Sequence, residues 1–116
     1  MNSIELNTVL IENFPNLKGD YQKEVEWQEG DETGSHTVYG DVFTPYIVKC
    51  IENKKDMDLR AVFDFLELLL SKEDAYANEV VAFSVIESIE YLLKEQKEIL
   101  DMLGNKTRKL LEELSI

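Results

Sequence analysis

The stretch SHTVYGDVFTPYIVKCI, residues 35–51, decides the fold class. Its apolar residues fall in neighbouring pairs, and each pair follows the previous one by four positions: Val38 and Tyr39, Val42 and Phe43, Tyr46 and Ile47, and Cys50 and Ile51. This spacing makes one wide stripe along an α-helix, whereas a half-buried strand would need strict alternation. We therefore expect a helix that Ser35 caps at its N-terminus and that is kinked or briefly broken at Pro45.

Helical spacing recurs on both sides of this stretch. It predicts helices over residues 3–14, 19–28, 58–70 and 74–93 and from residue 105 onward, with a loop over residues 29–34. The run KEQKEILDML, residues 94–103, either continues the helix before it or follows after a bend. The expected N-caps are polar residues at helix starts: Asp56 or Asp58, Asp74, and Asn105. Gly104 is the residue expected to end the preceding helix.

Two apolar segments indicate where the core lies. In the first helix, the residues expected to face inward are Ile4, Val9, Leu10 and Phe14. The segment VVAFSVI, residues 80–86, is apolar nearly all round, so the helix 74–93 should be central and covered on several sides. These patterns predict an all-α fold, a compact bundle of six or seven helices in one domain, residues 1–116. The helix pair at about 58–93 resembles one HEAT-like repeat of an α-solenoid, without a second copy.

Charge and composition restrict the function classes. The net charge of −12, from 24 acids and 12 bases, disfavours binding to nucleic acid or to anionic membranes. No apolar run approaches the roughly 20 residues that span a bilayer, and the N-terminus lacks the basic start of a signal peptide. Cys50 is the single cysteine, which agrees with a reducing compartment. We therefore expect a cytoplasmic protein.

The acids are concentrated near the front of the chain, in EVEWQEGDETGSHTVYGD, residues 24–41. Residues 20–41 hold seven acids and a single Lys. Such a surface either keeps the protein soluble or complements a basic partner. Trp27 lies among the acids and is either a core residue or the anchor of an interface, where Trp is enriched. His36 is either a hydrogen-bonded surface residue or part of the rim of a partner site.

Catalytic and metal chemistry find little support in the residues. His36 and Cys50 are the only His and Cys, and on one helix they would lie roughly 21 Å apart, too far for a nucleophile–base pair. Cys50 is better interpreted as a buried, inert residue. One His and one Cys cannot supply a usual zinc site. EGDETGSH resembles the start of a calcium loop, but its twelfth position is Gly40 in place of Glu. We expect no cofactor and no metal.

Three segments carry a resemblance to a known class of protein: HTVYGDVFTPYI, VFDFLELL and NEVVAFSVIESIEYL. Their pattern resembles that of small bacterial helical proteins that act as immunity proteins beside secreted or contact-delivered toxins. The resemblance implies a protein that neutralises one cognate toxin by tight binding. Many such toxins are nucleases with basic clefts, which an acidic helical protein could occupy.

The leading hypothesis is therefore an immunity protein, without enzymatic activity, that covers the basic active site of a toxin, and that is a monomer when bound to it. Its expected contact face comprises Glu24, Glu26, Trp27, Glu29, Asp31, Glu32, His36 and Asp41. The acids would pair with Lys and Arg of the toxin, and Trp27 would be the anchor. Two alternatives remain. One is a helical scaffold or adaptor that acts through protein–protein contacts or self-association. The other is a small enzyme or metal protein that uses the carboxylates near His36.

Overall fold

The computed structural model describes residues 1–115, which contain seven helices and no strand. The all-α bundle predicted from the sequence is confirmed. The first two helices are α1 (Ser3–Asn13) and α2 (Lys18–Glu26), joined by the 3₁₀ turn η1 (Pro15–Leu17). Predicted loop 29–34 contains a second 3₁₀ turn, η2 (Gly30–Glu32). The shorter remaining helices are α5 (Asp56–Ser71), α8 (Lys97–Leu100) and α9 (Asn105–Leu114).

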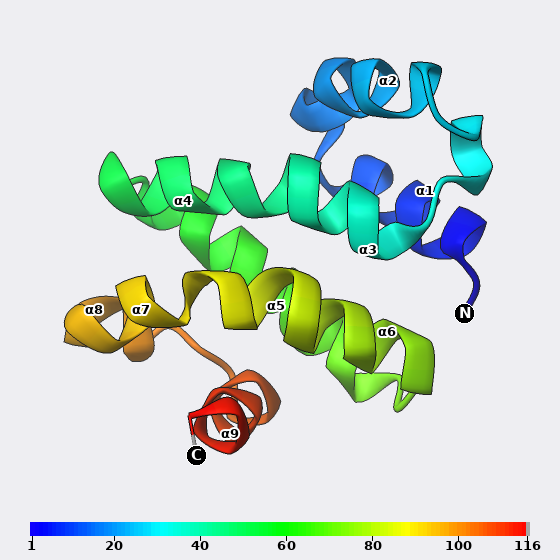
Figure 1. The fold of residues 1–116 in the computed structure, drawn as a ribbon. Helices are drawn as coiled ribbons and strands as arrows, with labels where there is room; N and C mark the ends of the chain where they lie inside the picture. The colour runs from blue at the N-terminus through cyan, green and yellow to red at the C-terminus, as the bar shows by residue number, and fades with distance from the viewer. Residues whose placement is uncertain (116) are drawn as a thin grey trace.

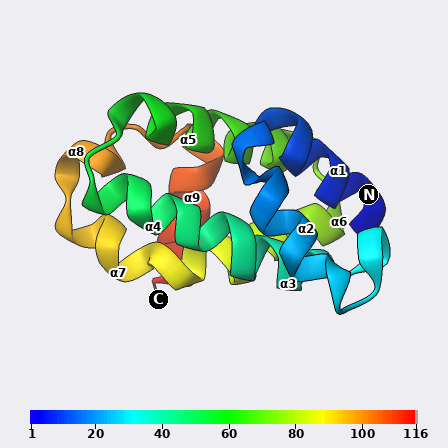
Figure 2. The same cartoon turned by 90° about the horizontal axis from the view of Figure 1, so that it is seen from above.

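Two longer helices form the centre of the molecule, and each contains a π-helical segment. One consists of α3 (Ser35–Val38), η3 (Tyr39–Phe43) and α4 (Thr44–Glu52), and the other of α6 (Ala75–Glu79), η4 (Val80–Ile86) and α7 (Glu87–Glu95). They lie side by side and run in the same direction (Figure 1). Helix α2 lies on one side of this pair, and α9 crosses on the other side. Seen from above, α5 runs antiparallel to α6–α7, which gives the helix pair expected at about 58–93 (Figure 2).

The π segments join the two central helices. In η3 the Thr44 amide donates to the Tyr39 carbonyl, and at the end of η4 the Glu87 amide donates to the Ala82 carbonyl. The Thr44 hydroxyl also donates to the Ser84 carbonyl at 2.7 Å, across the helix pair. The helix continues through Pro45, so the irregularity expected there takes the form of a π turn directly before the proline.

The buried apolar side chains form one cluster between these helices. Phe14, Phe43 and Phe65 meet at its centre, with ring centroids 5.1 to 5.8 Å apart. Val81 is fully buried, as the central position predicted for its helix requires. That helix is nevertheless not covered all round, because Phe83 is 56% exposed.

The predicted inward face of α1 is partly wrong. Leu10 and Phe14 are buried, but Ile4 is exposed. Leu6 and Asn7 face the core in its place, so the inner face of the helix is rotated from the expected one. The buried Asn7 is a polar residue that hydrophobic spacing cannot identify.

The structure confirms one of the predicted N-caps and corrects the others. Asp74 caps α6, since its carboxylate accepts from the Ala77 amide at 2.9 Å. Neither Asp56 nor Asp58 accepts a capping hydrogen bond, and both lie in the first turn of α5, where they complement the helix dipole. Ser35 is the first residue of α3, and its side chain bonds to α1 instead of to its own helix.

The cap of α9 comes from another helix. Glu67 of α5 accepts hydrogen bonds from the amides of Lys106 and Thr107, both at 2.9 Å, so the predicted cap Asn105 is wrong. Gly104 does not end α8, which stops at Leu100. A β-carbon on Gly104 would lie 2.4 Å from Glu67 Oε1, so this glycine is needed for the close approach of the capping carboxylate.

The run 94–103 follows its second predicted form. Helix α7 ends at Glu95, Gln96 is extended, and α8 begins at Lys97 after a bend. Among the helices of residues 1–115, none combines the length and apolar character that crossing a membrane requires.

Candidate functional site

A cleft of about 340 Å³ lies between α2 and the helix η3–α4. Asp20, Glu24 and Trp27 follow one another at four and three residues and so share one face of α2. Asp41, Pro45 and Lys49 form the facing wall by the same rule. The full lining is Leu17, Asp20, Lys23, Glu24, Trp27, Asp41, Val42, Pro45, Tyr46 and Lys49.

The carboxyl groups of Glu24 and Asp41 meet across this cleft. Partial burial and a side-chain hydrogen bond with Asp41 raise the pKa of Glu24, and the negative charge of Asp41 adds to the effect. A hydrogen bond from the Gln28 amide at 2.7 Å acts in the opposite direction. Two carboxyl groups can share a hydrogen bond only when one holds a proton. When both are ionised, the pair is an unfavourable contact between like charges.

The lysines of the cleft do not neutralise the carboxylates of Glu24 and Asp41. Within residues 1–115, ion pairs join the N-terminal ammonium to Asp74 and Lys94 to Glu90, both outside the cleft. Lys23 and Lys49 line the cleft but do not pair with its carboxylates. Three carboxylates and two ammonium groups leave the cleft with an excess of negative charge. The arrangement favours a guest that brings a positive charge between Glu24 and Asp41.

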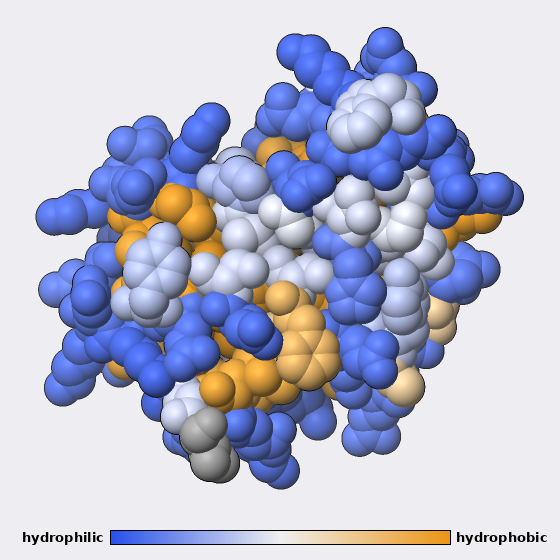
Figure 3. Space-filling view, viewed as in Figure 1, coloured by the Kyte–Doolittle hydropathy of each residue, from blue (hydrophilic) through white to orange (hydrophobic). Residues whose placement is uncertain are grey.

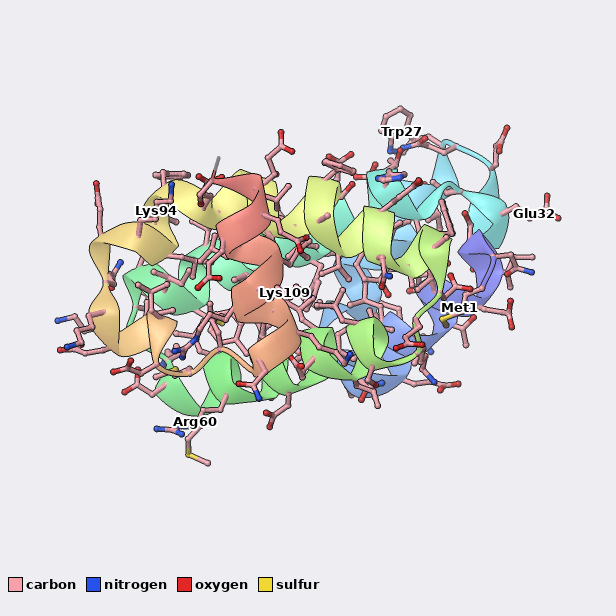
Figure 4. The ribbon with its side chains drawn as sticks, turned by 90° about the horizontal axis from the view of Figure 1, so that it is seen from below. Met1, Trp27, Glu32, Arg60, Lys94 and Lys109 are labelled. Carbon is pink, nitrogen blue, oxygen red and sulfur yellow. The ribbon has the colours of Figure 1, made fainter. Side chains whose placement is uncertain are left out.

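Trp27 stands at the edge of the cleft and is 74% exposed, so its interpretation as a core residue is wrong. Figure 4 shows its indole projecting beyond the ribbon into solvent. An indole that is both exposed and adjacent to a cleft can cover a guest side chain, and can stack on a cation.

The acidic segment after Trp27 is held by buried polar groups of α1 and α3. The Asn7 amide donates to the carbonyls of Thr33, at 2.8 Å, and Asp31, at 3.4 Å. The hydroxyl of Ser35 donates to Asn7 Oδ1 at 2.8 Å and fixes the orientation of that amide. The Thr33 hydroxyl closes the turn on the Gly30 carbonyl at 2.6 Å. The spacing of apolar residues in the sequence does not identify Asn7, Thr33 and Ser35 as the residues that position this segment.

The other predicted site residues lie outside the cleft. Asp31 accepts a hydrogen bond from the Tyr21 hydroxyl at 2.8 Å, and burial together with this bond raises the pKa of Tyr21 to about 12. Glu26, Glu29 and Glu32 are exposed, and Figure 4 shows Glu32 at the far end of the molecule. Of the eight predicted residues, the structure thus brings Glu24, Trp27 and Asp41 together in the cleft.

His36 is a hydrogen-bonded surface residue. Its Nδ1 lies 2.7 Å from the Ser84 hydroxyl, and its ring meets the edge of Tyr76 with centroids 5.8 Å apart. Cys50 is buried near the other end of the same long helix, where burial raises the pKa of its thiol. A thiol in such surroundings is a poor nucleophile. In the part of the chain from Met1 to Ser115, no three His, Cys, Asp or Glu side chains lie together as metal ligands would.

Asp20, Lys23, Tyr46 and Lys49 are cleft residues that the sequence analysis did not identify. The spacing of Asp20 to Glu24 could have placed Asp20 beside the predicted acids. No local signal could have paired the α2 face with Lys49, because that pairing depends on how the two helices pack.

The fold and the cleft define a small all-α protein whose site is an acidic surface cleft with an aromatic edge. A family profile described as a domain of unknown function (DUF7674) matches residues 7–116, and the chain belongs to this family. No curated protein and no solved structure gives a match to the chain.

Proposed function

We propose that this chain is a cytoplasmic, non-enzymatic binding protein that recognises one basic partner protein, and that the partner is a bacterial toxin domain. The observation that carries the proposal is the contact between Glu24 and Asp41 beside an exposed Trp27. The toxin is proposed to be a nuclease, because nucleases hold phosphates in basic clefts that an acidic face can cover.

The geometry indicates how one basic side chain would bind. An Arg or Lys of the partner enters the cleft with its charged end between Glu24 and Asp41. Its aliphatic stem lies along Val42 and Pro45, and the Trp27 indole closes over it. The guest relieves the repulsion between the two carboxylates, so binding gains more than an isolated surface ion pair would give.

The test begins with capture of partners from the source cell at low salt and at high salt, with the captured proteins identified by mass. The captured basic protein is then produced alone, and its affinity is measured against the parent and against Glu24→Lys with Asp41→Lys. A matched control, Asp64→Lys with Glu98→Lys, makes the same change in net charge on exposed positions outside the cleft.

We expect a one-to-one complex that weakens with salt and is lost in the cleft variant but kept in the control. We also expect this chain to restore growth of cells that express the captured protein. Equal loss of affinity in both double variants would mean that only net charge matters, and the cleft would not be the site. A captured protein without toxicity would remove the immunity role while keeping the cleft as a binding site.

A scaffold or adaptor role is the second candidate, because Phe83 and Tyr91 are large exposed side chains outside the cleft. The self-associating form of this role predicts a dimer at micromolar concentration. Sedimentation that finds only monomer over that range would count against it.

A further inference from the structure

Helix α6–η4–α7 exposes a regular row of side chains that the cleft does not use. Every fourth residue from Glu79 to Glu95 is exposed, and acids alternate with aromatics along the row. The row consists of Glu79, Phe83, Glu87, Tyr91 and Glu95. Phe83 is 56% exposed and Tyr91 is 61% exposed, whereas the other large apolar residues of η4 are buried.

The π segment keeps the first part of this row straight. In a regular α-helix, residue i+4 lies about 40° beyond residue i, so a row with a spacing of four drifts around the helix. A π turn holds more residues, so the same spacing falls short of a full turn there. Because η4 spans residues 80–86, it offsets the drift between Glu79 and Glu87 and places Phe83 between them on one side.

The charge around the row is mainly negative. Residues 73–95 contain six acids and one base, Lys94, which pairs with Glu90. At 1.5 Å per residue the row is roughly 24 Å long, which is comparable to the width of a standard protein interface. The face in Figure 3 carries a band of neutral and apolar surface over the two central helices, bordered by hydrophilic residues. An apolar centre with a charged border is the usual composition of an interface.

We propose that the row from Glu79 to Glu95 is a docking surface for a partner segment in which Lys or Arg alternates with apolar side chains. Phe83 and Tyr91 are the anchors, and the three glutamates select the positive charges. A second copy of this chain is a poor occupant, because the three glutamates of one row would face the three glutamates of the other. The inference is independent of the cleft proposal, since it rests on other residues of a different helix.

The test uses two synthetic peptides of equal positive charge, one of Leu and Lys at helical spacing and one of Ser and Lys. Amide chemical shifts of the labelled protein locate where each peptide binds and give its affinity. The Leu/Lys peptide should change the amide chemical shifts of residues 79–95 and bind about tenfold more tightly than the Ser/Lys peptide. Phe83→Ser with Tyr91→Ser should remove this advantage and leave the circular dichroism spectrum unchanged.

Two controls separate the possible results. Met57→Ser removes an apolar side chain that is 86% exposed on α5, and it should leave both affinities unchanged. Glu24→Lys with Asp41→Lys removes the two facing carboxylates of the cleft and should leave the chemical-shift changes over residues 79–95 in place. Equal affinity for the two peptides, or shifts confined to residues 20–49, would overturn the docking surface while leaving the cleft proposal standing. A dimer that the double serine variant abolishes would overturn it in favour of self-association.

Discussion

The contact between Glu24 and Asp41 makes a prediction that separates stability from function. Replacing Asp41 by Asn removes one charge of the pair and leaves the shape of the side chain nearly the same. The Asn amide can also donate a hydrogen bond to the Glu24 carboxylate, as Gln28 already does. Asp41→Asn should therefore stabilise the isolated protein, while binding to a basic partner becomes weaker because the cleft has lost one of its two facing carboxylates.

The size of the effect follows from the exposure of the pair. Two unit charges about 4 Å apart in water repel by about 1 kcal/mol, and physiological salt reduces this value. Both side chains are open to solvent at the cleft, so a gain of about 0.5 to 1 kcal/mol is expected. For a chain of this length that corresponds to a rise of roughly 2 to 4 °C in the melting temperature.

The pH dependence has a definite sign. The pKa of Glu24 is raised in the folded protein, so the folded state takes up a proton at higher pH than the unfolded chain does. The repulsion therefore destabilises the fold above the raised pKa and disappears as the pH falls towards 4.5, the ordinary value. The advantage of Asp41→Asn should be largest near neutral pH and should fade towards pH 4.5, as well as in high salt.

Thermal melting of the parent and of Asp41→Asn at several pH values measures this difference. Glu26→Gln is the matched control, because it removes one charge from an exposed position of α2 outside the cleft. It corrects for the small gain expected when any acid is removed from a chain with a net charge of −12. If Asp41→Asn is no more stable than Glu26→Gln, the two carboxylates do not oppose each other and the reasoning about the cleft is wrong.

Four other changes test the fold and the site. Trp27→Ala should change stability by less than about 0.5 kcal/mol, because the indole is exposed, yet weaken binding to the captured partner by 2 kcal/mol or more; a large drop in melting temperature would contradict the exposed position. Val81→Asp should lose about 4 kcal/mol or fail to fold, and a parent-like melt would show that its helix is not central. Glu67→Gln should cost about 1 kcal/mol at neutral pH. Burial alone would raise the pKa of Glu67, but hydrogen bonds from the α9 amides outweigh it and lower the pKa. This cost should therefore begin to decrease below pH 4.5 and vanish once the pH is below the lowered pKa; a cost that persists in strong acid would refute the charged cap. Asn7→Ala should speed amide exchange over residues 29–35, and unchanged exchange would show that Asn7 does not hold the loop.

The helices were predictable because their signal is local. The paired apolar residues of 35–51 have a helical period in their own spacing, and the continuously apolar run 80–86 indicates a segment that is covered on several sides. The same segments also contain the two π turns, which sequence analysis did not predict. The two π turns pack against each other, and Thr44 beside one of them donates to the Ser84 carbonyl in the other; such a contact between helices leaves no periodic trace.

The helix ends were less predictable, because tertiary contacts compete for the same polar side chains. Ser35 has the residue type of an N-cap, but its hydroxyl bonds to Ser3 and Asn7 of α1. Asn105 loses its expected role because Glu67 reaches the α9 amides from another helix. Asp74 was predicted correctly because its capping bond is made within its own turn.

The candidate site was predictable as a charge density and not as a shape. The concentration of acids over 20–41 directed attention to Glu24, Trp27 and Asp41, which the structure places at one cleft. Their separation from Glu29 and Glu32 follows from the direction in which the chain turns after α2, which composition cannot report. The exposure of Trp27 likewise depends on how α2 packs, since this helix buries Tyr21 and Val25 and leaves Trp27 outside the core.

The hydrogen bonds that order residues 29–35 affect the affinity of the protein for a partner. A flexible loop would lose conformational freedom on binding a partner, at a cost of roughly 1 to 2 kcal/mol for each backbone residue that becomes fixed. Here the buried Asn7, which Ser35 orients, already binds the Thr33 carbonyl of the loop. Much of this cost is then met during folding, so charge contacts at the surface can contribute to affinity directly. Asn7→Ala should therefore weaken partner binding without altering any residue of the cleft. Titration calorimetry would detect this as a less favourable binding entropy, whereas unchanged entropy would mean that the loop is equally ordered without Asn7.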